Sequence, residues 1–150
     1  MQILLIAFGL TIIASLGFYA GKLLFQLKQQ NERQQQARQK RIDSITQSVQ
    51  TIAMAMEQQQ CDLSEGAIRI CNLLAALPIV PQPDYPALYP RIHQLYQEIS
   101  HFPTHEARNG LSKAERRKQD REREQIEATH ETAILKELQE LRQIQPKQTV

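Results

Sequence analysis

Two histidines and a glutamate in the second half of the chain have the residue types of a small metal site. His101 and His105 stand four residues apart, and Glu106 follows directly. On an uninterrupted helix this spacing places two metal ligands on one face, as a metal-dependent or hydrolytic enzyme requires. Pro103 falls between them, however, and the order His-Phe-Pro-Thr-His-Glu differs from the zinc-protease pattern His-Glu-x-x-His. An enzyme that uses this cluster is therefore the alternative hypothesis, and surface or capping histidines are the favoured interpretation.

The cysteines Cys61 and Cys71 supply further ligand types, but their ten-residue spacing is unlike that of a zinc knuckle. Cys71 falls on an apolar helical stripe, where a thiol is inert and its pKa is raised. We expect both cysteines to be small buried hydrophobic residues rather than a disulfide. The chain has no Gly-x-Ser-x-Gly motif and only five glycines from which to build a phosphate-binding loop. We therefore expect no enzyme activity, no catalytic or metal-binding residue and no cofactor.

The apolar stretch at the start of the chain decides where any site is located. From Ile3 to Gly21 there is no charged side chain, and the first one is Lys22. As a helix these 19 residues span about 28 Å, close to the hydrocarbon thickness of about 30 Å of a bilayer. We predict that residues 1–21 are a transmembrane anchor. A cleaved signal peptide, which would release a soluble body, is an alternative, but signal peptides carry their basic residues before the apolar core.

The segment after the anchor, residues 22–41, is a basic, Gln-rich stalk. It contains a single acidic residue, Glu32, against six basic ones: Lys22, Lys28, Arg33, Arg38, Lys40 and Arg41. The positive-inside rule therefore predicts a single-pass inner-membrane protein with a periplasmic N-terminus and a cytoplasmic C-terminal domain. Lys22 and Lys28 form the basic flank that faces the lipid head groups. The formal net charge of +2 is too small to indicate a nucleic-acid partner.

Residues 42–150 are expected to form one small all-α cytoplasmic domain. Apolar residues with heptad spacing mark the end of the first helix: Ile42, Ile45, Val49, Ile52 and Met56. Packing of this seam within the chain is favoured over packing against a second copy. The anchor itself carries a Gly-x-x-x-Gly pair, Gly17 and Gly21, through which a homodimer is a further expectation.

Further helices follow from the same periodicity. Asp62 and Glu65 have the spacing of a capping box, which predicts a helix that begins there and ends before Pro78. Gly66 in its first turn indicates close packing. A proline-rich connector, residues 78–86, leads to a third helix that runs to about Ser100.

A capping box of the usual type opens the last helix, which is expected from Ser112 to about Arg142. Its first half is almost entirely charged and its second half has an apolar stripe, which indicates an arm that faces solvent or a partner. The candidate interaction surface comprises Arg69, His105, Glu106, Arg108, Arg116 and Arg117.

Three segments carry a resemblance to a known family. Residues 61–70 (Cys-Asp-Leu-Ser-Glu-Gly-Ala-Ile-Arg-Ile), residues 103–108 (Pro-Thr-His-Glu-Ala-Arg) and the charged run 114–118 (Ala-Glu-Arg-Arg-Lys) are similar to a domain-of-unknown-function family of small, membrane-anchored gammaproteobacterial proteins. The resemblance implies a bacterial inner-membrane location and an all-helical body, and it supplies no activity. Together these observations favour an inner-membrane protein whose cytoplasmic domain is an interaction or scaffolding module with an unidentified protein partner.

Overall fold

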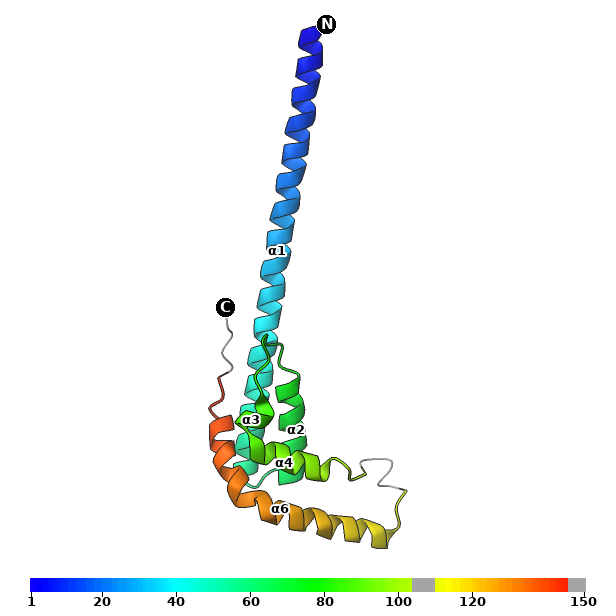
Figure 1. Ribbon diagram of the computed structural model, residues 1–150, viewed down its shortest axis with the longest axis vertical. Helices are drawn as coiled ribbons and strands as arrows, with labels where there is room; N and C mark the ends of the chain where they lie inside the picture. Colours follow the sequence, from blue (N-terminus) through cyan, green and yellow to red (C-terminus); the bar gives the residue numbers. More distant parts are fainter. Residues whose placement is uncertain (104–109, 146–150) are drawn as a thin grey trace. The chain divides into compact units, whose positions relative to one another are not determined.

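A computed structural model of the chain describes residues 1–103 and 110–145, the side chains of residues 3–5 excepted. Within these ranges the chain is helical and contains no strand, so the predicted all-α class is confirmed. Figure 1 shows the helices in chain order: α1 (Gln2–Glu57), α2 (Leu63–Ala75), α3 (Tyr85–Leu88), α4 (Pro90–Ile99) and α6 (Lys113–Leu141).

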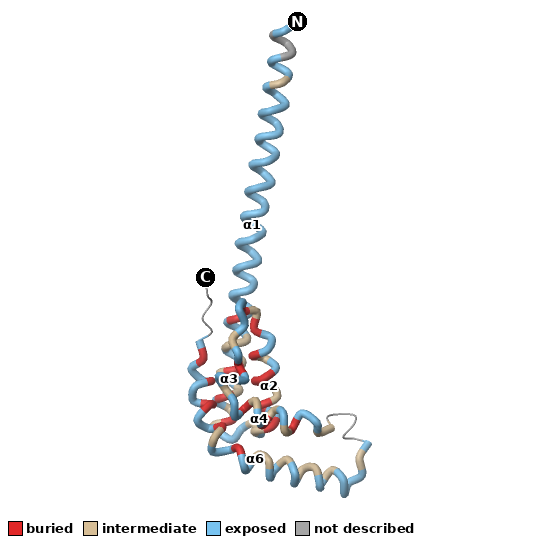
Figure 2. The backbone as a smooth tube through the Cα atoms, in the orientation of Figure 1, coloured by how far each residue is buried: buried red, intermediate tan, exposed pale blue. Residues whose placement is uncertain are grey.

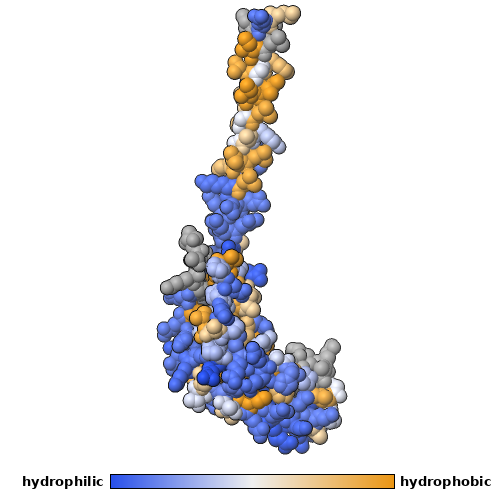
Figure 3. All heavy atoms as spheres, viewed as in Figure 1, coloured by the Kyte–Doolittle hydropathy of each residue, from blue (hydrophilic) through white to orange (hydrophobic). Residues whose placement is uncertain are grey.

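The chain divides into two compact units, which we call the N-terminal unit (Met1–Lys40) and the helical body (Arg41–Val150). The N-terminal unit consists of α1 residues, and its described side chains are exposed except at Gly9 (Figure 2). Its first part is apolar and its second part is polar, as Figure 3 shows in orange and blue. By length and composition α1 is a candidate membrane span near the N-terminus, which agrees with the predicted anchor.

The helical body has one apolar core, to which the last turns of α1 contribute. Ile42, Val49 and Met56 are at most 2% exposed, and Ile45 and Ile52 pack against the same core. These are the residues of the heptad seam. The prediction that the seam packs within the chain is therefore confirmed.

A Schellman motif ends α1 without a glycine. Gln59 adopts a left-handed conformation with φ of 56°. The Gln60 N–H donates to the Ala55 carbonyl at 2.8 Å and the Gln59 N–H to the Met56 carbonyl at 3.1 Å, which are the two bonds of that motif. The chain can then reverse direction, and Met56 meets Gly66 of α2, where an added Cβ would lie 2.2 Å from the Met56 sulfur.

The predicted capping box at the start of α2 is wrong. Asp62 is the N-cap residue, but its side chain makes no capping hydrogen bond. Glu65 instead pairs with Arg69 one turn further along. The Ser64 N–H at the start of α2 instead finds its acceptor on a distant helix. Both this N–H and the Ser64 hydroxyl donate to the carboxylate of Glu127 on α6.

The connector before α4 is less extended than predicted. Residues 85–88 form the short helix α3, which Asp84 caps by accepting from the Ala87 N–H at 3.2 Å. Pro90 occupies the first position of α4, where its missing N–H leaves no hydrogen bond unmade. The start of α4 is capped by Glu137 of α6, whose carboxylate accepts from the N–H groups of Arg91 at 2.8 Å and Ile92 at 2.9 Å.

The helix α6 contributes to the core of the body and supplies the acceptors that cap α2 and α4. Its predicted capping box is present, because Ser112 accepts from the Glu115 N–H and Glu115 accepts from the Ser112 N–H. In its second half Ile134, Leu138 and Leu141 are fully buried, which confirms the predicted apolar stripe. In its first half the row Arg116, Gln119, Asp120 and Arg123 is only half-buried. The first half therefore forms a wall beside α2 and α4 rather than part of the core.

Candidate docking groove

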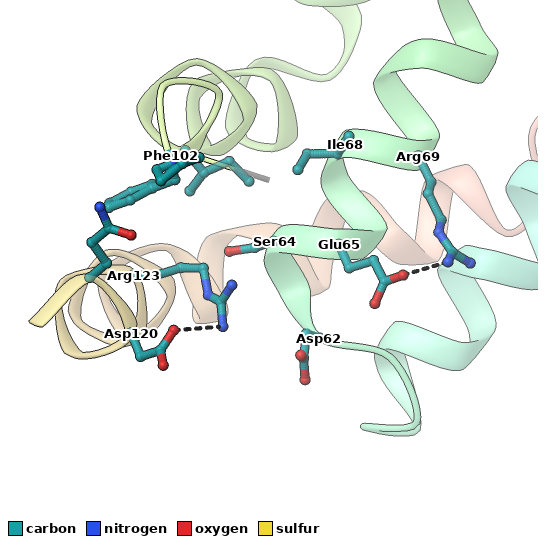
Figure 4. A pocket seen from close by; sticks show the side chains of 11 residues that line it. Asp62, Ser64, Glu65, Ile68, Arg69, Phe102, Asp120 and Arg123 are labelled. Carbon is teal, nitrogen blue, oxygen red and sulfur yellow. Dashed lines mark hydrogen bonds and ion pairs between the residues drawn. The ribbon is translucent and has the colours of Figure 1, made fainter. Parts of the chain in front are cut away.

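A groove of about 430 Å³ opens on the helical body between α2, the end of α4 and the first half of α6 (Figure 4). The residues that line it combine apolar and charged side chains. They are Asp62, Ser64, Glu65, Ile68, Arg69, Ile99, Phe102, Pro103, Gln119, Asp120 and Arg123. We call it the α2–α6 groove.

The floor of the α2–α6 groove is apolar. Ile68 on α2 and Phe102 after α4 lie on opposite sides of the opening in Figure 4, and both are half-buried. Ile99 is 3% exposed and connects this floor to the core. His101 stacks on the Phe102 ring with centroids 4.4 Å apart. An apolar side chain of a ligand could therefore be buried here without rearrangement of the core.

The rim of the groove is charged, and its charged side chains other than Asp62 form ion pairs. Arg69 pairs with Glu65, and both side chains are more than half exposed. Arg123 extends from α6 toward α2 and lies 3.8 Å from both Asp120 and Glu127 (Figure 4). Exposed pairs of this kind contribute at most about 1 kcal/mol to stability, so they can exchange partners at low cost.

The structure brings part of the predicted interaction surface to this groove. Arg69 lines it, and Arg116 continues the inward-facing row of α6, with a buried Nε atom that has no hydrogen-bond partner among the described residues. Arg117 is exposed on another face of α6. The remaining predicted residues, His105, Glu106 and Arg108, lie outside the described residues.

The sequence reasoning missed the floor of the groove and most of the α6 wall. Ile68 and Phe102 come from separate helices, and no local pattern brings them together. The α6 wall had a usable signal, because positions 116, 120 and 123 repeat at helical intervals. The run was interpreted from its charge alone, and charge does not indicate which side of a helix faces the protein.

The cysteines do not share a site. Cys71 is buried, and its Sγ lies 3.9 Å from the Ile92 carbonyl. Burial, with a smaller contribution from Glu137, raises the pKa of the Cys71 thiol to about 12. Cys61 is half-buried, and burial followed by the charge of Glu65 raises the pKa of its thiol. Both thiols are free, and the expectation that Cys71 is an inert buried residue agrees with its surroundings.

The metal hypothesis gains no ligands from the described part of the chain. Within residues 1–103 and 110–145 no group of three or more His, Cys, Asp and Glu side chains could hold a metal ion. His101 is exposed and stacked on Phe102. The other two members of the proposed cluster, His105 and Glu106, lie outside the described residues.

Comparison with known proteins identifies the family of the chain. An uncharacterized protein of Haemophilus influenzae (strain ATCC 51907 / DSM 11121 / KW20 / Rd) is 37% identical over 130 residues, which cover 87% of this chain and 86% of that protein. No solved structure matches the chain. The family model described as "Protein of unknown function (DUF2489)" matches residues 13–141. The resemblance to a gammaproteobacterial family of unknown function is thereby confirmed, and the chain belongs to the DUF2489 family.

Proposed function

We propose that this protein is a single-pass protein of the bacterial inner membrane whose helical body binds a partner protein from the cytoplasmic side. The candidate span near the N-terminus supports the anchor. The basic excess of residues 22–41 supports the orientation, because positively charged flanks stay in the cytoplasm. The body then serves as an interaction module that is held at the membrane surface.

The α2–α6 groove carries the binding part of the proposal. Its apolar floor, Ile68 and Phe102, is surrounded by polar side chains, which is the usual composition of the centre and rim of a protein interface. Burial of one Leu or Phe side chain of a partner contributes about 1.5–3 kcal/mol. A stable contact buries about 1,000 Å² or more in total. The groove would thus hold the anchoring side chain of a larger interface.

The partner class follows from the charges on the rim. Glu65 and Asp120 are each paired with an arginine, and Asp62 is the remaining carboxylate of the lining. The rim therefore has little net charge to offer a strongly charged ligand. We therefore propose a protein segment with an apolar anchor side chain flanked by neutral polar residues. This assigns a binding role rather than a reaction, and stoichiometric zinc or iron in the purified full chain would overturn it.

Site-directed photo-crosslinking in the living bacterium tests this proposal. A photoreactive amino acid replaces Gln119, which lines the groove, or Arg121, which is exposed on another face of the same helix. We expect a discrete adduct with one protein from position 119 and little or none from position 121. Ile68→Asp, which places a charge on the floor, should abolish that adduct. Equal adducts from both positions, or no adduct from position 119, would contradict the proposal.

A further inference from the structure

A second groove on the helical body, of about 360 Å³, lies between the end of α1, the start of α2 and the middle of α6. We call it the acidic groove, after the carboxylates that line it. Its lining residues are Met56, Glu57, Gln59, Cys61, Asp62, Leu63, Glu124, Glu127, Ala128, Glu131 and Leu135.

Every charged side chain of this lining is negative. Glu57 is neutralised by Arg142 at 3.1 Å, and Glu127 lies 3.8 Å from Arg123. The other three, Asp62, Glu124 and Glu131, have no ion-pair partner in the part of the chain that the structure describes. A bound partner could therefore meet three carboxylates that the fold leaves uncompensated.

The arrangement of the carboxylates on α6 adds to this argument. Glu124, Glu127 and Glu131 are spaced by three and four residues, so they lie on one face of the helix. Like charges at these spacings destabilise a helix, by about 0.2–0.5 kcal/mol per pair. The body bears this cost when the groove is empty, and cationic side chains in the groove would remove it.

The floor of the acidic groove is apolar. Met56 belongs to the core, Leu63 is half-buried, and Leu135 is 37% exposed although it lies on the same helix as fully buried leucines. A ligand that supplied charge alone would leave Leu135 and Leu63 in contact with water. The groove thus fits a segment that presents both an apolar side chain and cations.

We propose that the acidic groove binds a basic segment of a partner protein, in which an apolar anchor side chain is flanked by Lys or Arg. The proposal rests on the docking role proposed above and adds a second contact, in another groove, with a segment of different chemistry. A single metal ion does not fit, since no group of three or more described His, Cys, Asp or Glu side chains converges closely enough to hold one. Anionic lipid head groups and nucleic-acid phosphates carry the same sign of charge as the groove and would be repelled.

Peptide binding to the full chain tests the inference. The protein is reconstituted in nanodiscs of phosphatidylcholine, which carry no net charge, and binding of a fluorescent amphipathic peptide of Lys and Leu is measured by anisotropy. Empty nanodiscs report the contribution of the lipid. The double variant Glu124→Gln/Glu131→Gln should weaken binding roughly tenfold, which corresponds to about 1.4 kcal/mol.

A matched double variant separates the groove from general electrostatics. Glu122→Gln/Glu140→Gln changes the net charge by the same amount at two exposed positions of α6 that do not line the groove. It should leave the affinity within about twofold of the unchanged protein, because solvent and salt screen exposed charges that do not touch the bound peptide. Protection of the buried Cys71 thiol from a labelling reagent verifies that each variant is folded.

The outcomes separate this inference from the proposed function. Equal weakening by both double variants, or equally tight binding of a peptide of Lys alone, would overturn the inference of a basic, apolar-anchored partner. If position 119 still gives its adduct in that case, the docking role of the body stands. Conversely, weaker peptide binding in Glu124→Gln/Glu131→Gln alone supports the acidic groove. If position 119 also gives no adduct, the proposal that fails is the one for the α2–α6 groove.

Discussion

Large apolar side chains are exposed in one unit of the chain and buried in the other. In the N-terminal unit Ile13 is 68% exposed and Phe18 is 78% exposed, and no described side chain of this unit is buried. In the helical body Ile70 and Leu74 are fully buried. One isoleucine thus belongs to a surface that the described part of the chain leaves uncovered, and the other to a core. The contrast is what a membrane span followed by a folded body would show, and by length and composition the first helix is a candidate span.

The two regions differ in the pattern of their apolar residues as well as in composition. In the body, apolar residues recur at helical intervals, so each helix has one face to bury. In the first 21 residues they cover every face, so no arrangement of helices within the chain could remove them all from water. Exposure of a large apolar side chain to water costs about 1.5–3 kcal/mol relative to burial. A bilayer removes this cost for all faces at once, and the body needs only its own core.

Truncation of a single isoleucine in each unit should give the largest contrast. Ile70→Ala should lower the free energy of unfolding of the body by about 2–5 kcal/mol, because it leaves a cavity in the core. Ile13→Ala should leave that free energy unchanged. Labelling of the buried Cys71 thiol across a urea series, in a Cys61→Ser background, reports unfolding of the body. Equal effects of the two substitutions would break the comparison.

Loss of the carboxylate that caps α4 should have the next largest effect. Glu137→Ala leaves the N–H groups of Arg91 and Ile92 without an acceptor and should cost about 2–3 kcal/mol. Glu140→Ala, at an exposed position of the same helix, is the matched control and should cost less than about 0.5 kcal/mol. If the two variants unfold at the same urea concentration, the body does not depend on caps supplied across the core.

A smaller effect is expected where α1 and α2 cross. In Gly66→Ala the new Cβ would lie 2.2 Å from the sulfur and 2.6 Å from the Cγ of the buried Met56 side chain. Overpacking costs about 1–3 kcal/mol and the gain in helix propensity returns about 1 kcal/mol, so net destabilisation of about 1 kcal/mol is expected. In a Met56→Ala background the same substitution should stabilise the body. Destabilisation in both backgrounds would show that Met56 is not the cause.

The smallest effect concerns pH. His130 is buried and its Nε2 lies 3.0 Å from a Glu98 carboxylate oxygen, and this hydrogen bond, with a smaller one from Gln94, lowers the pKa of Glu98. A carboxyl whose pKa is lower in the folded state stabilises the fold above its unfolded pKa, and this contribution is lost as the pH falls through the folded value. The body should therefore lose stability below the usual Glu range, and Glu98→Gln should show a shallower loss. An identical acid profile in the variant would contradict this.

The parts of the fold that were predictable depend on residues close in sequence. The seam from Ile42 to Met56 and the capping box of Ser112 and Glu115 could be predicted because helical periodicity and a three-residue spacing are local. The caps of α2 and α4 could not, since their acceptors, Glu127 and Glu137, lie far along the chain. Asp62 was a local candidate for the capping side chain of α2, but its side chain makes no capping hydrogen bond. The helix α3 differs, because its cap, Asp84, is local. There the four prolines of residues 78–86 indicated an extended connector instead of a helix.

The candidate sites show the same limit more strongly. Arg69 and Arg116 were predicted from their charge, and Arg69 lines the α2–α6 groove. The floor of that groove comes from α2 and from the segment after α4, and the acidic groove requires α1, α2 and α6 together. Grooves are made by packing between elements, so a pattern within one element could indicate their rims but not their floors.

The central proposal, that the N-terminal unit spans the inner membrane and the helical body is cytoplasmic, is tested most directly by reporters fused after Val150. One reporter enzyme is active only in the periplasm and the other only in the cytoplasm. The basic residues 22–41 predict activity of the cytoplasmic reporter alone, in the membrane fraction. Activity of the periplasmic reporter alone would contradict this orientation and would place both grooves on the other side of the membrane.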